Sequence, residues 1–147
     1  MSEPEMTTWD GKAVSRAEPH GASIIVYRQN GGAVELLILH RAHAAELNGD
    51  WAWTPPSGAR YPEENPADCA ARELWEETGL RLALRHIPRN VESWYLYAAE
   101  AAAQAEIVLD AEHDQYAWVS VAEAVQRCQP AQVSEGIQTV VSKMGLQ

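Results

Sequence analysis

Three glutamates within residues 72–77 have the chemical type and the spacing to hold a metal ion. On a helix, Glu73, Glu76 and Glu77 stand at positions i, i+3 and i+4, so their carboxylates share one face. Like charges this close destabilise a helix unless a cation neutralises them. Hard oxygen ligands suit a divalent cation, with Mg²⁺ first and Mn²⁺ as the alternative. The segment therefore predicts a metal site with a catalytic role.

The helix that must carry these glutamates is predicted over residues 66–78. Asn65 is a good N-cap, Pro66 suits the first helical position, and Gly79 suits the position just after the last turn. An apolar stripe beside the carboxylates would let one side of the helix pack on a sheet while the other lines a cleft. This stripe consists of Ala67, Ala70, Ala71 and Leu74.

Strands are expected on both sides of this helix. Residues 23–27 and 33–39 are compact apolar runs, and the Asn-Gly signal at Asn30 between them predicts a hairpin. Two more strands are expected at residues 92–100 and 106–109, joined as a second hairpin. Short strands are also expected at residues 51–54 and 115–119.

Two further helices are expected near the end of the chain. The first begins at Ser120, which forms a capping box with Glu123, and extends to about Cys128. The second covers residues 131–144 and ends at a glycine. The long central helix falls between groups of strands. This order predicts an α/β fold in which a mixed sheet lies between helices.

Length and charge limit the possible classes of protein. The 147 residues fit one domain, with residues 1–20 as a flexible N-terminal arm and residues 21–147 as the folded domain. The net charge of −10 weighs against a long nucleic acid as partner, since such binding needs a basic surface. A small phosphorylated ligand stays open, because a bound divalent cation can bridge acidic protein and anionic substrate.

The cysteines and the apolar segments predict a location. Cys69 and Cys128 form neither a zinc pattern nor a disulfide framework, which suits a reducing cytoplasm. The acidic N-terminus has no apolar signal region, and no segment approaches the roughly 20 apolar residues of a membrane span. We therefore expect a soluble, cytoplasmic protein.

The surroundings of the three glutamates complete a longer pattern. Residues 58–80 read G-x5-E-x7-R-E-U-x-E-E-x-G-U, where U is aliphatic, and all nine specified positions are filled. A chance match at so many positions is negligible. The segment resembles the signature of the Nudix hydrolases. This resemblance implies a Nudix α/β/α sandwich with a mixed β-sheet between helices, and an enzyme that hydrolyses phosphoanhydride bonds.

The same resemblance implies a set of roles within the pattern. The three glutamates would ligate Mg²⁺, and the carbonyl of Gly58 could add another ligand. Arg72 would pair with a glutamate and hold it in the right rotamer. Three roles stay open for Glu64: it could accept a proton from the attacking water, bind a metal, or brace the loop. Further along the chain, Glu112 resembles the glutamate that completes the metal shell in many members, with Asp114 as the alternative.

Nudix proteins commonly cleave a nucleoside diphosphate linked to another moiety, so a small nucleotide is the implied partner. Residues 53–58 and 112–118 resemble the diadenosine tetraphosphate hydrolase branch, which also carries a tyrosine near Tyr95 or Tyr97. Ser57 departs from that branch, which usually has a phosphate-touching lysine there. A dinucleoside polyphosphate or a nucleoside triphosphate is therefore predicted, with ADP-ribose or a nucleotide sugar as the alternative.

The aromatic and basic side chains leave several assignments open. Aromatic faces stack on bases, although core packing is the better expectation for any single aromatic residue. The aromatic residues that could stack on a nucleotide base are Trp51, Trp53, Tyr61, Trp94, Tyr95 and Tyr97. The nearby cations Arg28, Arg41 and Arg60 are expected to be solvated surface charges.

One alternative comes from another class of protein: a non-catalytic Nudix module that senses a nucleotide without cleaving it. Such a module would be expected to have lost glutamates of the pattern, and all of them are present. The sequence leaves the oligomeric state open between a monomer and a homodimer.

Overall fold

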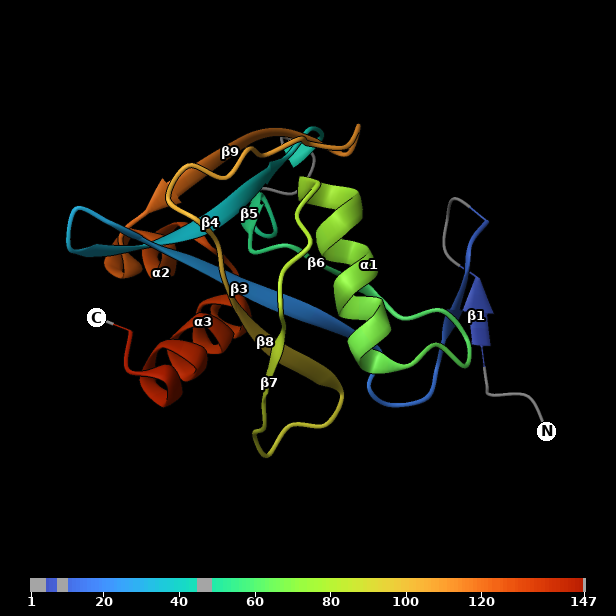
Figure 1. Cartoon of the computed structure of the whole chain (residues 1–147). Helices are drawn as coiled ribbons and strands as arrows, with labels where there is room; N and C mark the ends of the chain where they lie inside the picture. Colours follow the sequence, from blue (N-terminus) through green and yellow to red (C-terminus); the bar gives the residue numbers. More distant parts are fainter. Residues whose placement is uncertain (1–4, 8–10, 45–48, 147) are drawn as a thin grey trace.

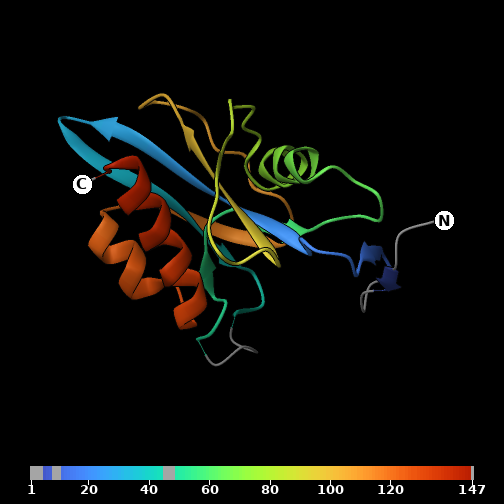
Figure 2. The same cartoon turned by 90° about the horizontal axis from the view of Figure 1, so that it is seen from below.

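A mixed β-sheet lies between helices on its two faces (Figures 1 and 2). The computed structural model of the chain describes residues 5–7, 11–44 and 49–146. Helix α1 (Pro66–Thr78) covers one face of the sheet, while α2 (Val121–Arg127) and α3 (Ala131–Met144) cover the other. The predicted α/β/α sandwich is therefore confirmed. None of the helices in the described ranges is long and apolar enough to cross a membrane.

The first two long strands form the hairpin that the Asn-Gly signal predicts. Strand β3 (Gly21–Asn30) pairs antiparallel with β4 (Ala33–Arg41), and Asn30 is opposite Ala33. The two residues between the strands, Gly31 and Gly32, have φ angles of 61° and 87°. Positive φ at both positions is the requirement of a type I′ turn, whose twist matches that of the strands.

Strand β3 is the hub of the sheet, because it is bonded to three other strands. It pairs antiparallel with β4 and with β6 (Ser57–Ala59), and parallel with β8 (Trp94–Glu100). Outside β3, the antiparallel pairs are β4 with β5 (Trp53–Thr54), β4 with β9 (His113–Val119), and β8 with β7 (Arg85–Ile87). The parallel pair makes the sheet mixed, as predicted, and α1 lies in the crossover between its two strands.

The boundaries of α1 follow from its caps. The Asn65 side chain accepts a hydrogen bond from the Ala67 N–H, and Gly79 has a φ of 75°, where its N–H bonds to the Trp75 carbonyl. The predicted apolar stripe is wrong at two positions, since Ala67 and Ala71 are exposed. The helix instead turns a neighbouring set of residues toward the sheet: Cys69, Ala70, Leu74, Glu77 and Thr78.

Two apolar clusters, one on each side of the sheet, hold the layers together. Alternation along β3 sends Ile25 to the cluster under α2 and α3, and Ile24 and Val26 to the cluster under α1. Helix α3 has the predicted bounds, and the two predicted end residues of α2 are its caps: Cys128 follows its last residue, and Ser120 accepts from the Glu123 N–H. Helix α1, which carries the candidate site residues, is therefore held against the sheet by a hydrophobic core.

The second predicted hairpin is wrong. Residues 106–109 form no strand; they run beside the sheet, and the Val108 N–H bonds to the Thr78 carbonyl at the end of α1. The antiparallel partner of β8 is β7, which precedes it in the chain and was not predicted. The predicted strand at residues 51–54 shrinks to β5, because Trp51 has a φ of 64°.

The described part of the N-terminal segment contacts the loop before α1. Strands β1 (Glu5–Thr7) and β2 (Ala13–Ser15) pair with each other, and the Ser15 N–H bonds to the Arg60 carbonyl. Arg60 is only 4% exposed and donates to the carbonyls of Pro19 and Glu64, so the expectation of a solvated charge is wrong there. The division into an arm of residues 1–20 and a domain of residues 21–147 stays a prediction, and residues 1–4 and 8–10 lie outside the described residues.

Candidate active site

Arg72 is the organising cation of the site. Its Nε and Nη2 donate to the two oxygens of Glu64 at 2.8 and 2.9 Å, a bidentate pair. Its Nη1 donates to Glu73 at 2.8 Å, and Nη2 also reaches the Ala59 carbonyl. The guanidinium lies 3.8 Å from the ring centre of Tyr61. Arg72 therefore fixes the position of both carboxylates.

Glu64 is held at both oxygens. Its Oε1 accepts a further hydrogen bond from the Tyr61 N–H at 3.0 Å. Although burial raises the pKa of this carboxyl, the bonds from Arg72 and Tyr61 outweigh burial, so the pKa is lowered. Of the three roles left open by the sequence, this geometry favours bracing of the loop.

Glu73 and Glu77 form a buried carboxylate pair. Their side chains are 13% and 6% exposed and hydrogen-bond to each other, which requires one of the two to carry a proton. Burial raises the pKa of Glu77 well above its ordinary value, and the bond and charge of Glu73 raise it further. Burial also raises the pKa of Glu73, against the opposing bonds from Glu77 and Arg72. A proton thus neutralises this pair when no cation does.

Gly58 is where the loop meets this pair. A Cβ added to Gly58 would lie 2.1 Å from Cδ of Glu73, so only glycine lets the backbone approach the carboxylate so closely. Next to it, the Ser57 N–H donates to Glu77 Oε1 at 3.2 Å. A Cβ on Gly21 would lie 2.3 Å from the Gly58 carbonyl oxygen, which places that oxygen toward β3. The loop and α1 therefore lock together at these backbone contacts.

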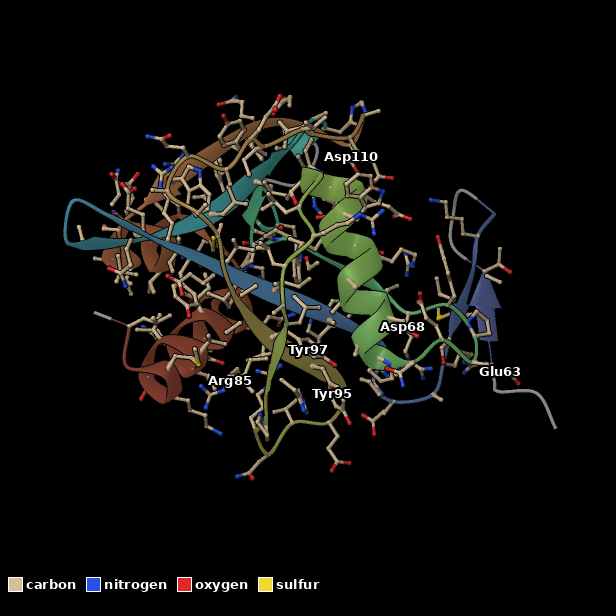
Figure 3. The ribbon with its side chains drawn as sticks, viewed as in Figure 1. Glu63, Asp68, Arg85, Tyr95, Tyr97 and Asp110 are labelled. Carbon is tan, nitrogen blue, oxygen red and sulfur yellow. The ribbon has the colours of Figure 1, made fainter. Side chains whose placement is uncertain are left out.

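A histidine and an aspartate that the pattern does not contain join the pair. His113, at the start of β9, hydrogen-bonds through Nδ1 to Asp110 at 2.7 Å. Its Nε2 lies 3.9 Å from Glu77 Oε1. Figure 3 shows Asp110 beside the C-terminal end of α1. Residues 77 and 113 are 36 positions apart in the sequence, so no local pattern predicts this contact.

Two predicted ligands stand apart from the buried pair. Glu76 is 45% exposed and lies 3.4 Å from Nη1 of Arg72. Glu112 is exposed, in the turn before β9, where its carbonyl accepts from the Ala42 N–H. Asp114, the alternative to Glu112, pairs with His40 at 2.6 Å. Of the predicted site residues, the structure thus brings together Gly58, Glu64, Arg72, Glu73 and Glu77, with Glu76 at the edge.

The chemistry of these donors fits a divalent cation. Within the described ranges, no group of three or more His, Cys, Asp or Glu side chains is arranged as a finished metal cage. Mg²⁺, however, is usually bound by one or two carboxylates and completes its shell with water and substrate oxygens. Glu73 and Glu77 provide two such carboxylates, and their shared proton marks the charge that a cation would neutralise.

A cavity of about 480 Å³ lies on the face of the sheet opposite α1. Its lining includes Ser57 of β6, Trp94 of β8 and residues at the start of α3. A volume of this size suits a small organic ligand. Ser57 lines the cavity while its N–H holds Glu77, so the cavity and the carboxylate pair are separated by one strand.

Two of the six aromatic candidates for a base clamp, Trp51 and Trp94, line this cavity. Tyr95 and Tyr97, labelled in Figure 3, alternate with Trp94 along β8, so their side chains leave the opposite face of the sheet. Tyr97 belongs to the core under α1, and Tyr95 stacks on His86. The others are engaged with arginines: Tyr61 with Arg72 and Trp53 with Arg127.

Comparison with known proteins identifies the family. Residues 18–142 match the NUDIX domain model, which covers most of the chain. The chain therefore belongs to the Nudix family of hydrolases, as the pattern of residues 58–80 predicts. Members of this family act on pyrophosphate bonds and generally use divalent metal ions.

Individual relatives agree with this assignment. The chain is 31% identical over 126 residues to the asymmetrical bis(5'-nucleosyl)-tetraphosphatase of Mus musculus, covering 76% of this chain and 79% of that protein. It is 33% identical over 134 residues to an octanoyltransferase of Myxococcus xanthus, covering 82% of this chain but only 36% of that longer protein. The predicted similarity to the tetraphosphatase branch is confirmed.

Solved structures show the same fold. A C. elegans Ap4A hydrolase complex superposes with a TM-score of 0.70 at 20% identity, over 85% of this chain and 96% of the other. The E. coli dihydroneopterin triphosphate pyrophosphohydrolase gives a TM-score of 0.69 at 18% identity, over the same shares, 85% and 96%. At these identities the likeness concerns the fold alone.

Proposed function

We propose that this chain hydrolyses phosphoanhydride bonds of small nucleotides with Mg²⁺ as its cation. The observation that carries the proposal is the burial of Glu73 and Glu77 beside each other, held in place by Arg72 and the Ser57 N–H. A protein that only needed a stable helix would not bury two like carboxylates against each other. Their arrangement is explained by a cation that takes the place of the proton.

In this proposal, Glu73 and Glu77 bind the cation, and Glu76, Glu112 and the Gly58 carbonyl are the further candidates for its shell. The exposure of Glu76 and Glu112 leaves both side chains free to turn toward a bound ion. When bound, the cation neutralises phosphate charge and acidifies a water molecule. Arg72 and Glu64 act as positioning residues, because they bind each other while Arg72 also holds Glu73.

The reaction requires a base for the attacking water. Water attacks phosphorus, the bridging P–O bond breaks, and the proton of the water passes to a carboxylate. Glu64 is poorly suited to accept it, since both of its oxygens are occupied and its pKa is lowered. This leaves the base among Glu73, Glu76 and Glu77.

The proposed substrate is a dinucleoside polyphosphate or a nucleoside triphosphate, with ADP-ribose or a nucleotide sugar as the alternative. The support is the 31% identity to the Mus musculus tetraphosphatase over most of both chains. Ser57, where that branch usually has a lysine, weakens the case for a long polyphosphate. Retention of every glutamate in the pattern disfavours a non-catalytic sensor, and the charge of −10 disfavours RNA. A cytoplasmic location and a possible homodimer stay predictions; both cysteines are free and buried.

The test is a hydrolysis panel with product identification, run with and without Mg²⁺. It contains dinucleoside polyphosphates, nucleoside triphosphates, ADP-ribose and nucleotide sugars. We expect Glu77→Gln to lower kcat by about 100-fold or more, since one of the two buried carboxylates that bind the cation is lost. The matched control is Glu92→Gln, an exposed glutamate outside the site. Turnover of Glu77→Gln near that of the control would refute the proposal.

A further inference from the structure

Arg89 carries an unpaired donor in the interior. Its Nε is the one buried side-chain nitrogen or oxygen without a hydrogen-bond partner in residues 5–7, 11–44 and 49–146. The Nη2 of the same guanidinium donates to the Trp94 carbonyl at 2.9 Å, which fixes the orientation of the side chain. A buried donor left unpaired costs about 1–3 kcal/mol, so it calls for an acceptor. Arg89 lines the 480 Å³ cavity, where a ligand could supply one.

Glu135 lines the same cavity from α3. It is close enough to Arg89 to influence its pKa, which burial lowers and the charge of Glu135 raises. No ion pair joins the two among the described residues, and the Glu135 carboxylate has no hydrogen-bond partner there. A cation and an anion therefore face one cavity without binding each other. A purely anionic ligand would be repelled by the Glu135 carboxylate. A neutral group that carries a hydrogen-bond acceptor beside hydrogen-bond donors would pair with both Arg89 and Glu135.

The aromatic wall of the cavity suits a flat ligand. The Trp94 indole N–H donates to Ser23 Oγ at 2.8 Å, which holds the ring in place. A Cβ on Gly21 would lie 2.5 Å from that ring, so the backbone supports it directly. Trp51, also in the lining, is one of two non-glycine residues in the described ranges with positive φ, at 64°. Strain of this kind is typical of binding sites.

The cavity and the reacting groups lie on opposite sides of the same strand, β6. Ser57 belongs to the cavity lining, and the Ser57 N–H bonds to Glu77. In a nucleotide whose base lies in the cavity, the phosphates would have to extend past β6 to reach the carboxylate pair. This step depends on the proposed function, because it takes the ligand to be the substrate.

We propose that the cavity binds the substrate's base, and that Arg89 and Glu135 select a guanine-type base over adenine. Guanine presents a carbonyl oxygen next to an N–H and an amino group. The oxygen would accept from Arg89, and the two donors would match the two oxygens of Glu135. Adenine places an amino group where the carbonyl stands and has no adjacent ring N–H. Adenine would therefore place a hydrogen-bond donor opposite the donors of Arg89, and one oxygen of Glu135 would have no hydrogen-bond partner.

The test measures binding of GMP and AMP to the metal-free protein by titration calorimetry. The variants are Glu135→Gln, on the exposed surface of α3, and Arg89→Lys, which keeps the charge but removes the Nε–H. The matched controls are Glu92→Gln and Arg85→Lys, both at exposed positions outside the cavity lining. We expect GMP to bind about 10- to 100-fold more tightly than AMP, the range of one charge-assisted hydrogen bond. Each variant should reduce this ratio to a few-fold, and the controls should keep it.

Several results would overturn the assignment. These are no binding of either nucleotide, AMP bound as tightly as GMP, or a preference that survives in both variants. Because the assay contains neither metal nor turnover, it is independent of the hydrolysis test. A GMP preference in a protein that hydrolyses nothing would refute the proposed function alone. Magnesium-dependent hydrolysis without base preference would refute the selection by Arg89 and Glu135 alone.

Discussion

Replacing Arg72 by lysine tests whether the site depends on the shape of the guanidinium or only on its charge. Arg72 donates to Glu64 twice, at 2.8 and 2.9 Å, and to Glu73 once, at 2.8 Å. A lysine ammonium is a single point that cannot span both oxygens of Glu64 and also reach Glu73. Arg72→Lys therefore keeps the positive charge and breaks the geometry.

The expected loss can be estimated from these three bonds. Hydrogen bonds to charged groups contribute about 1.5–3 kcal/mol each, and a lysine would retain about one of the three. The Arg72 side chain is 19% exposed, so water recovers part of the difference. We expect the free energy of unfolding to fall by about 2–3 kcal/mol. Because Glu73 loses its orienting partner, kcat should fall about 10- to 100-fold as well.

The assay combines urea unfolding with turnover measured across a Mg²⁺ titration. Arg81→Lys is the matched control, since Arg81 stacks on Trp75 at 4.1 Å outside the carboxylate network. If Arg72 orients a ligand, the turnover loss should remain at saturating Mg²⁺; if it only adds charge, Arg72→Lys should lose no turnover at any Mg²⁺ concentration. Stability and kcat of Arg72→Lys equal to those of Arg81→Lys would refute the clamp.

Two other predictions concern the carboxylate pair. Gly58→Ala places a methyl group 2.1 Å from Cδ of Glu73. It should lower the free energy of unfolding, measured in urea, by about 1–3 kcal/mol and abolish most hydrolysis. Wild-type stability and turnover would contradict the close approach of the Gly58 backbone to Glu73. In the metal-free protein the raised pKa of Glu77 means that the native state holds a proton which the unfolded chain releases. The free energy of unfolding should therefore fall as pH rises above the unfolded pKa near 4.3, by at most about 1.4 kcal/mol per pH unit for this proton, until the raised native pKa is passed. Glu77→Gln should flatten this part of the profile, and an equal slope in both proteins would contradict the shared proton.

The elements that sequence predicts best are those set by local chemistry. The bounds of α1 come from Asn65, Pro66 and Gly79, and each of these residues acts within one turn of the helix end. The β3–β4 turn depends on two glycines with positive φ. Such signals need no knowledge of the rest of the chain, which is why both elements form as predicted.

The failed strand at residues 106–109 shows the opposite case. Its alternation is real, because Ile107 and Leu109 pack on the cluster under α1 while Val108 is 58% exposed. Alternation reports burial of every second side chain, and an extended segment can achieve this without a neighbouring strand. The strand that does pair with β8 is β7, which is only three residues long and has two exposed positions. Its sequence therefore shows no alternation that would predict a strand.

The candidate site also has features that local sequence predicts and features that it does not. The spacing of Glu73 and Glu77 predicts that they share a face, and their α1 carboxylates do meet. Spacing does not predict that this face turns toward the sheet, since a buried Glu77 contradicts the usual preference of charges for solvent. Arg60 and His113 owe their roles to partners far away in the chain, and Arg89 owes its role to the cavity that it lines, so no local pattern marks them.

The three residues of β6 determine how the two halves of the proposed site relate to each other. Ser57 is opposite Ser23 in the pairing with β3, and Ser23 accepts the indole N–H of Trp94 in the cavity wall. On the other side, the Ser57 N–H holds Glu77, and Gly58 contacts Glu73. Because this strand is hydrogen-bonded into the sheet, neither half can shift without breaking backbone pairing. A substitution that displaces β6 should therefore alter nucleotide binding and turnover together, whereas changes at Arg89 or Glu135 should alter base preference alone.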